Sequence, residues 1–212
     1  MSENAELLSL AQRLLLGGVA LACADPRQHY PLLPGETLPQ ATPARRAEFS
    51  AGRHAARQAL QHLGLPGRAI PAHADRSPLW PLGISGTITH SRSACLAAVR
   101  HGAGIGLDLE EAEGLERDLW PSILSESEQL WAYDQPDPGL AAKLIFCAKE
   151  AAYKAQYSHS GQLFGFESLK ITVTGEAFTA SFNENIAPFR KGDAIKGRWG
   201  LASGHILTAA AL

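Results

Sequence analysis

The spacing of apolar residues predicts a long helix in the first half of the chain. Thr42 and Pro43 are a favourable N-cap and first helical residue, and Gly64 is a natural stop. The apolar stripe of this helix holds Phe49, Ala56, Leu60 and Leu63.

A second long helix is predicted over about 139–157, with Asp137 and Pro138 at its start. Its apolar positions fall into two stripes on nearly opposite sides. One stripe holds Leu140, Leu144, Ala148, Ala151 and Ala155, and the other holds Phe146, Tyr153 and Tyr157. A helix that is apolar on two sides is expected to be well covered. A capping box at Ser125 and Glu128 predicts a shorter helix through about Tyr133.

Short apolar or alternating runs predict the strands. They cover residues 17–24, 84–90, 95–99, 105–109, 169–174, 178–182, 197–202 and 205–212. The runs 95–99 and 105–109 flank a glycine-containing link at 101–104 and are predicted to pair as a hairpin. Residues 111–124 read as a polar loop. Because strand runs and helices segregate without a strict β-α-β alternation, the predicted fold class is α+β.

The strand Ile105–Glu110 is the strongest chemical signal. Its apolar residues alternate with Asp108 and Glu110, whose Cα atoms lie about 7 Å apart on the other face. Two carboxylates on one strand face repel each other unless a cation lies between them. Mg²⁺ with phosphate oxygens would satisfy them, and an edge strand with a solvated acidic face is the alternative.

Basic residues gather on the first helix. Arg46, Arg53 and Arg57 share one face, with Arg45 beside them at the first turn. They are either a solvated helix face or a grip for phosphate, because a guanidinium matches phosphate oxygens in pairs.

Two further candidates come from other elements. In the second helix Glu150 and Lys154 lie one turn apart, either as an ordinary surface pair or as an acid and a base in a cleft. His90 ends the strand 84–90 near the acidic strand and could contact phosphate.

Composition narrows the class of protein. The 212 residues are 45% hydrophobic and 19% charged with a formal net charge of −2, typical of a globular protein and not of a nucleic-acid or membrane binder. Three well-separated cysteines form neither a disulfide framework nor a zinc motif, and no apolar run could span a membrane. The start lacks the basic residues of a signal peptide. Because the cysteines indicate a reducing compartment, we expect a cytoplasmic protein.

Two motifs then point to a family. Residues 106–110 (Gly-Leu-Asp-Leu-Glu) and 146–154 (Phe-Cys-Ala-Lys-Glu-Ala-Ala-Tyr-Lys) resemble the two signatures of the 4′-phosphopantetheinyl transferase superfamily, with Leu107 in place of Ile or Val. Further matches are 45–49 with Arg53, Pro78–Pro81 and Thr89–Ser91. Together they resemble the single-chain type represented by enterobactin synthetase component D.

The resemblance implies a fold and a reaction. The fold would be two pseudo-twofold-related α+β halves, here residues 1–105 with the arginine helix and His90, and 106–212 with the carboxylates, with the active site between them. Such enzymes move the 4′-phosphopantetheine arm of coenzyme A onto a serine of an apo acyl or peptidyl carrier protein and release 3′,5′-bisphosphoadenosine. The cofactor would be Mg²⁺.

The resemblance also implies roles for residues. Asp108, Glu110 and Glu150 would be the metal carboxylates, and Glu150 or a metal-bound water would deprotonate the serine. Lys154 would contact the pyrophosphate and could protonate the leaving phosphate. The other coenzyme A contacts would be Arg45, Arg53, His90, Lys149 and, for the basic residue usual before the Pro-x-Trp-Pro segment, Arg76.

Partners and alternatives complete the prediction. We expect a monomer, because both halves lie in one chain, and the charge balance gives no reason to expect nucleic-acid or membrane partners. The carrier is expected to dock on 111–135 through Leu119, Trp120 and Leu124. One alternative is a catalytically silent relative that binds a carrier protein or nucleotide. Another is a different Mg²⁺-dependent phosphotransferase, although the chain has no glycine-rich phosphate loop.

Overall fold

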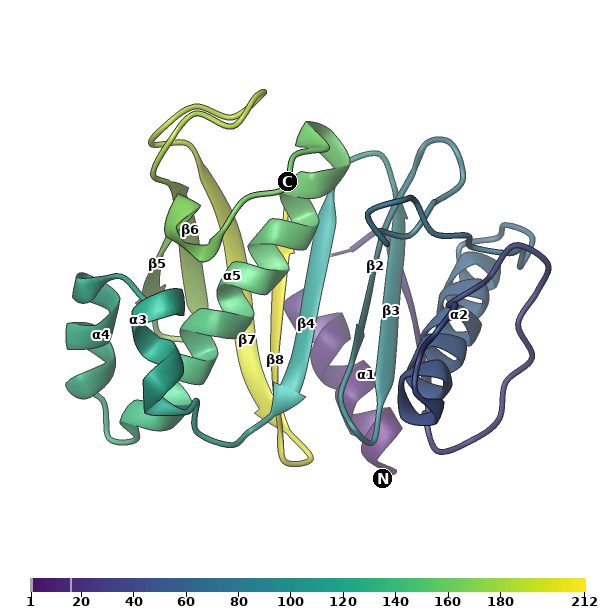
Figure 1. Cartoon of the computed structure of the whole chain (residues 1–212), viewed down its shortest axis with the longest axis horizontal. Coiled ribbons are helices and arrows are strands. Elements are labelled where there is room, and N and C mark those ends of the chain that lie inside the picture. The colour runs from purple at the N-terminus through teal and green to yellow at the C-terminus, as the bar shows by residue number, and fades with distance from the viewer. Residues whose placement is uncertain (1, 16) are drawn as a thin grey trace.

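Antiparallel strands form two sheets in the computed structural model, which describes residues 2–15 and 17–212 (Figure 1). The smaller sheet has the order β1-β3-β2, with β1 at Val19–Ala24, β2 at Ile84–His90 and β3 at Cys95–His101. The larger has the order β4-β8-β7-β6-β5, with β4 at Ile105–Glu111, β5 at Leu169–Thr174, β6 at Ala177–Phe182, β7 at Ala194–Ala202 and β8 at His205–Ala211. Helices flank both sheets, and the α+β class is confirmed.

The two long helices begin where their caps predicted. Thr42 Oγ1 accepts a hydrogen bond from Arg45 N at the start of α2 (Pro43–His62), and Asp137 Oδ1 accepts one from Leu140 N at the start of α5 (Pro138–Ser160). The capping box of α4 (Glu126–Tyr133) is also present. Helix α1 (Glu3–Leu14) was not predicted.

The predicted hairpin between 95–99 and 105–109 is wrong. Strand β3 is the middle strand of its sheet, so β1 and β2 occupy both of its edges and leave none for β4. Strand β4 instead pairs with β8, with Asp108 opposite Thr208. The actual hairpin is β2–β3, closed by the bond from Ser91 N to Ala94 O.

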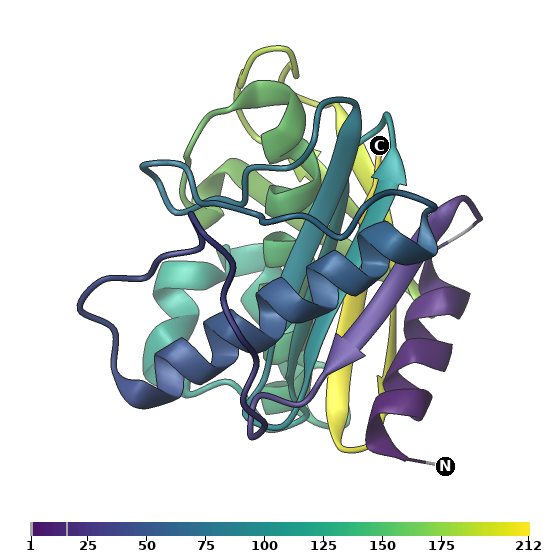
Figure 2. The same cartoon turned by 90° about the vertical axis from the view of Figure 1, so that its right-hand side faces the viewer.

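Each long helix covers a different sheet. Helix α2 crosses one face of the small sheet, which faces the viewer in Figure 2, and its alanines pack against Ala97 and Val99. The other face of that sheet shares a core with α1, β4 and β8. This core contains Ile105, Leu107 and Leu109, so the predicted alternation along β4 is confirmed.

The two sheets meet where β2 runs beside β4. Thr87 Oγ1 accepts a hydrogen bond from Leu107 N at 3.1 Å, and Thr89 Oγ1 accepts one from Leu109 N at 2.9 Å. Threonine side chains thus accept the backbone hydrogen bonds of β4 along the edge that faces the small sheet. A division of the chain at residue 105 stays a prediction.

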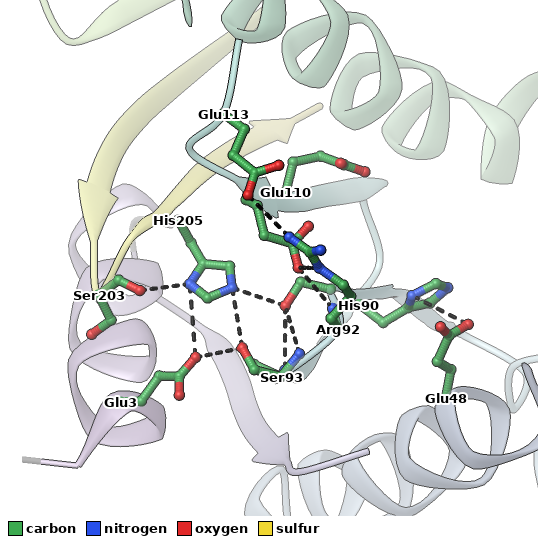
Figure 3. A network of polar contacts seen from close by, with 12 residues as sticks. Glu3, Glu48, His90, Arg92, Ser93, Glu110, Glu113, Ser203 and His205 are labelled. Carbon is green, nitrogen blue, oxygen red and sulfur yellow. Dashed lines mark hydrogen bonds and ion pairs between the residues drawn. The ribbon is translucent and has the colours of Figure 1, made fainter. Parts of the chain in front are cut away.

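A second junction lies at the end of β2 (Figure 3). His205 Nδ1 donates to the Ser203 carbonyl at 2.8 Å, so His205 Nε2 can accept from Ser91 Oγ at 2.9 Å. Ser93 Oγ donates to Glu3 at the start of α1. These bonds tie the β2–β3 turn to α1 and to the β7–β8 turn.

The region 111–124 is more ordered than a polar loop. It contains a 3₁₀ turn at Arg117–Leu119 and the short helix α3 at Trp120–Ile123; a further 3₁₀ turn, Phe166–Ser168, precedes β5. Of the three predicted contact residues, Trp120 and Leu124 are buried in the core and Leu119 is exposed. The predicted carrier contacts through Trp120 and Leu124 are therefore wrong, because those side chains hold α3 on the protein. Among the described residues, no helix is long and apolar enough to cross a membrane.

Candidate active site

A glycine brings the two signature segments together. A Cβ atom on Gly106 would lie 1.9 Å from the Ala151 carbonyl oxygen, so only glycine lets the backbone of α5 pack directly on β4. Glu150 and Lys154 flank this contact on α5, and Asp108 follows it on β4. The close approach thus places acids and a lysine from distant parts of the chain in one cluster.

Asp108 and Lys154 form the centre of this cluster. Lys154 Nζ lies 2.6 Å from Asp108 Oδ1 and also donates to the Leu107 carbonyl at 3.2 Å. Burial opposes the charge on Lys154, but the charges of Asp108 and Glu150 outweigh it, so the pKa of Lys154 is raised. Lys154 is therefore a permanent cation in this setting.

The other two carboxylates lie near enough to repel Asp108. Burial raises the pKa of Glu110, and the charge of Asp108 adds to the rise, while Lys143 Nζ at 3.4 Å opposes it. Burial also raises the pKa of Glu150; Lys154 opposes the rise, and Asp108 and Glu110 reinforce it. Lys143 and Lys154 therefore do not fully compensate the negative charges of the three carboxylates, since the pKa values of Glu110 and Glu150 stay raised.

Asp108, Glu110 and Glu150 offer the kind of oxygen ligands that a hard cation takes. Asp108 Oδ2 is buried and has no hydrogen-bond partner among the described residues. Across residues 2–15 and 17–212, no three His, Cys, Asp or Glu side chains are close enough to enclose a metal ion. Mg²⁺ does not need an enclosing cage of side chains. It usually takes one or two carboxylates and completes its coordination shell with water and phosphate oxygens.

A cleft of about 980 Å³ opens beside this cluster. One wall is the segment 73–80 with part of β2, and the other is the end of α5 from Tyr153 onward; Lys154 also lines it. Arg76 lies on the first wall, which places the predicted substitute for the usual basic residue at the cleft. A cleft of this volume can hold a ligand of considerable size.

Arg45 and His90 come together at the start of α2, and Figure 3 shows His90 beside Glu48. Arg45 Nη1 donates to His90 Nε2 and, at 3.0 Å, to Glu48. His90 Nδ1 lies 3.7 Å from the same Glu48 oxygen. Burial lowers the pKa of His90, Glu48 opposes this effect, and the charge of Arg45 adds to it. A neutral imidazole beside a partly exposed guanidinium can receive an anionic ligand.

The other arginines of α2 do not form one phosphate-binding face. Arg57 is buried and pairs with the buried Glu36, and Arg46 is exposed. Arg53 is buried over the ring of Phe49. Its Nε donates to the Ile70 carbonyl at 2.8 Å, and burial lowers its pKa to about 10. Arg57 thus stabilises the fold, and a phosphate contact at Arg53 stays a prediction.

Lys149 requires a correction. Its side chain is almost fully buried, and its ammonium group donates to the Ile123 carbonyl at 2.7 Å, to Glu128 at 2.9 Å and to the Phe166 carbonyl at 3.0 Å. These three bonds use all three hydrogens. Lys149 therefore ties α5 to α3, α4 and the segment before β5, and we remove it from the phosphate contacts.

Three polar residues of the site were not predicted. Glu48 orders Arg45 and His90, Thr89 Oγ1 lies 3.4 Å from Asp108 Oδ1, and Lys143 pairs with Glu110. Glu48 and Thr89 lie in the segments 45–49 and 89–91, which matched the family but drew attention for Arg45 and His90. Lys143 lies two turns before Glu150 on α5, which is the only sequence signal for it.

Comparisons with known proteins agree along most of the chain. Residues 28–100 match the model of the 4'-phosphopantetheinyl transferase N-terminal domain, and residues 104–207 match that of the 4'-phosphopantetheinyl transferase superfamily. The chain is 35% identical over 182 residues to 4'-phosphopantetheinyl transferase Npt of Nocardia iowensis, covering 79% of this chain and 82% of that protein.

Two more relatives of this chain are members of the same family of transferases or the related enterobactin synthase component D. The chain is 32% identical over 186 residues to 4'-phosphopantetheinyl transferase PptT of Mycobacterium tuberculosis, covering 79% of each protein. It is 43% identical over 133 residues to enterobactin synthase component D of Salmonella typhi. That match covers 60% of this chain and 55% of the relative, so it spans about half of the relative's length.

Proposed function

Because the chain belongs to the 4′-phosphopantetheinyl transferase superfamily, we propose that it transfers 4′-phosphopantetheine from coenzyme A to a serine of an apo carrier protein. The carrier would be an acyl or peptidyl carrier protein, free or as a domain. The observation that carries the proposal is the ion pair of the buried Asp108 with the half-buried Lys154 beside the cleft, with Glu110 and Glu150 next to it.

Each step of the transfer has a candidate group in this cluster. The serine oxygen bonds to the phosphorus that bears pantetheine, and the bond from that phosphorus to the other pyrophosphate group breaks. Glu150 accepts the serine proton. Lys154 donates a hydrogen bond to the departing phosphate of 3′,5′-bisphosphoadenosine and offsets its negative charge. Asp108 holds the Lys154 ammonium in place for this role.

We propose Mg²⁺ as the cofactor, held by Asp108, Glu110 and Glu150. When bound, it would neutralise pyrophosphate charge and stabilise the charge that develops in the transition state. The unpartnered Asp108 Oδ2 and the raised pKa values of Glu110 and Glu150 support this assignment.

Coenzyme A would extend from this cluster toward α2. We assign Arg45 and His90 to its 3′-phosphate, with Arg53 behind them, and Arg76 to a phosphate in the cleft. The partly exposed guanidinium of Arg45 and the place of Arg76 on the cleft wall support these roles. We also propose a cytoplasmic monomer; its cysteines are all free thiols.

One experiment tests the activity. The protein is incubated with coenzyme A, Mg²⁺ and several apo carrier proteins, and each carrier is weighed by mass spectrometry. We expect a phosphopantetheine increment on at least one carrier and none when its acceptor serine is replaced by alanine. Unmodified carriers throughout, with coenzyme A still bound by the protein, would instead favour a catalytically silent binding relative.

A further inference from the structure

A short arm, residues 71–79, forms the outer part of one cleft wall. Leu79 N donates to the Pro71 carbonyl, and His73 N donates to the Ser77 carbonyl, both at 2.9 Å. The arm is therefore a narrow loop closed on itself. It lies at the end of the molecule where α5 ends, at the top of Figure 1.

The tip of the arm is bonded to the opposite wall of the cleft. Tyr157 on α5 donates its phenolic hydrogen to Asp75 Oδ2. The other oxygen of Asp75 accepts from Ser77 Oγ at 2.7 Å and from Ser77 N at 2.9 Å. The carboxylate thus fixes its own loop with one oxygen and ties that loop to α5 with the other.

The backbone next to this contact is constrained. Arg76 has φ +74°, which is unfavourable for a residue with a side chain, and its N donates to the His73 carbonyl. Such a conformation persists where the surroundings fix it. Here the residues on its two sides are held by hydrogen bonds, Asp75 to Tyr157 and Ser77 to Asp75. The Arg76 side chain lines the cleft.

We propose that Asp75 and Tyr157 are positioning residues that hold the arm against α5, so that Arg76 faces the phosphate groups of the substrate in the cleft. The proposal rests on the proposed function, since it takes the phosphate-bearing ligand to be coenzyme A. Tyr157 lies one turn after Lys154, so one helix segment supplies both the lysine of the cluster and the anchor of the arm.

Both partners stay in the protonation state that the contact requires. The hydrogen bond from Tyr157 lowers the pKa of Asp75 to about 2, so the acceptor stays ionised at neutral pH. The same bond raises the pKa of Tyr157, so the donor keeps its hydrogen. Because the contact acts on the arm and not on the reacting atoms, its loss should weaken binding and leave the chemical step intact.

Hydrogen exchange of the free protein tests the anchor without any substrate. In Tyr157→Phe we expect backbone amides of residues 72–77 to exchange faster than in the parent protein. Tyr133→Phe is the matched control, because it removes the same hydroxyl from a tyrosine on α4 away from the cleft. Unchanged exchange in the arm of Tyr157→Phe would overturn the proposal.

Kinetics with coenzyme A tests the link to Arg76. Tyr157→Phe and Asp75→Ala should each raise the KM for coenzyme A about three- to tenfold with kcat unchanged, which is the loss of one hydrogen bond. Asp75→Asn keeps an acceptor oxygen and should restore most of the affinity. The double variant Tyr157→Phe with Arg76→Ala should bind no more weakly than Arg76→Ala alone.

The outcomes separate this proposal from the transferase itself. A loss confined to kcat, or fully additive losses in the double variant, would overturn the positioning role. A parent protein that modifies none of the carriers counts against the transferase assignment. In that case the exchange experiment still decides whether the anchor exists.

Discussion

At the scale of single residues, Asp108 has one oxygen on Lys154 and another that is buried without a partner among the described residues. If a cation completes this group, Mg²⁺ should raise the Tm of the protein, because a ligand of the native state stabilises it. Asp108→Asn keeps the shape but removes the charge. We expect it to lose most of the Mg²⁺-dependent shift and to slow transfer on the order of 10²-fold.

Thermal melts with Mg²⁺ and then with a chelator measure the shift, and the mass of the carrier measures transfer. Asp134→Asn, at the exposed end of α4, is the control and should behave like the parent protein. The shift should also be larger at neutral than at mildly acidic pH, because protons compete for carboxylates with raised pKa values. Equal shifts in both variants would rule out Asp108 as a ligand.

His90 gives a prediction with a defined sign. Burial lowers its pKa, the negative charge of Glu48 raises it, and the positive charge of Arg45 lowers it. Glu48→Gln should therefore move the pKa of His90 further down, and Arg45→Ala should move it up. An NMR titration of the imidazole proton measures both shifts. Shifts of the same sign in the two variants would contradict the arrangement.

Residue identity alone did not separate functional from structural cations. Arg57 shares a helix face with Arg53, where the sequence left a solvated face and a phosphate grip both open, and Lys149 precedes the motif glutamate, where the resemblance implied a phosphate contact. Their partners Glu36 and Glu128 lie 21 residues away along the chain in each case. Whether a cation meets such a partner depends on tertiary packing, which no local pattern contains.

At the scale of elements, the contact of α5 with β4 depends on Gly106. Gly106→Ala would force its Cβ against the Ala151 carbonyl, so α5 must move away from β4. We expect a loss of about 1–3 kcal/mol in the free energy of unfolding, typical of overpacking, together with slower transfer. The second effect follows because Glu150 and Lys154 move with the helix.

Urea unfolding and transfer rates test this prediction. Gly17→Ala is the control, because a Cβ at Gly17 would meet nothing within 4 Å. A Gly106→Ala protein with parental stability and rate would show that the close approach is dispensable.

Elements with local signals were predicted well. The N-caps Thr42, Ser125 and Asp137 define helix starts through bonds to residues three positions onward, so their sequence context is sufficient. Strand pairing is different. The wrong hairpin joined neighbours in sequence, whereas β4 pairs with β8 about a hundred residues later, so its partner depends on the whole fold.

At the scale of the whole molecule, the candidate site lies where the two sheets meet. Strand β2 supplies His90 and the small-sheet side of the junction, and β4 supplies Asp108 and Glu110. The hydroxyls of Thr87 and Thr89 bond the edge of β4, and Thr89 also approaches Asp108. The same side chains therefore join the sheets and align the site.

Thr89→Val tests that double role. Valine keeps the branched shape, but the buried Leu109 N–H loses its acceptor, which should cost about 1–3 kcal/mol of unfolding free energy. Because the junction also aligns β4, we expect slower transfer at saturating coenzyme A. Thr89→Ser retains the hydroxyl and should recover most of both losses, and Thr172→Val, at an exposed position of β5, should cause neither. Urea unfolding and initial transfer rates measure the two effects. If Thr89→Val lost stability but kept its rate, the junction would hold the sheets together without aligning the site.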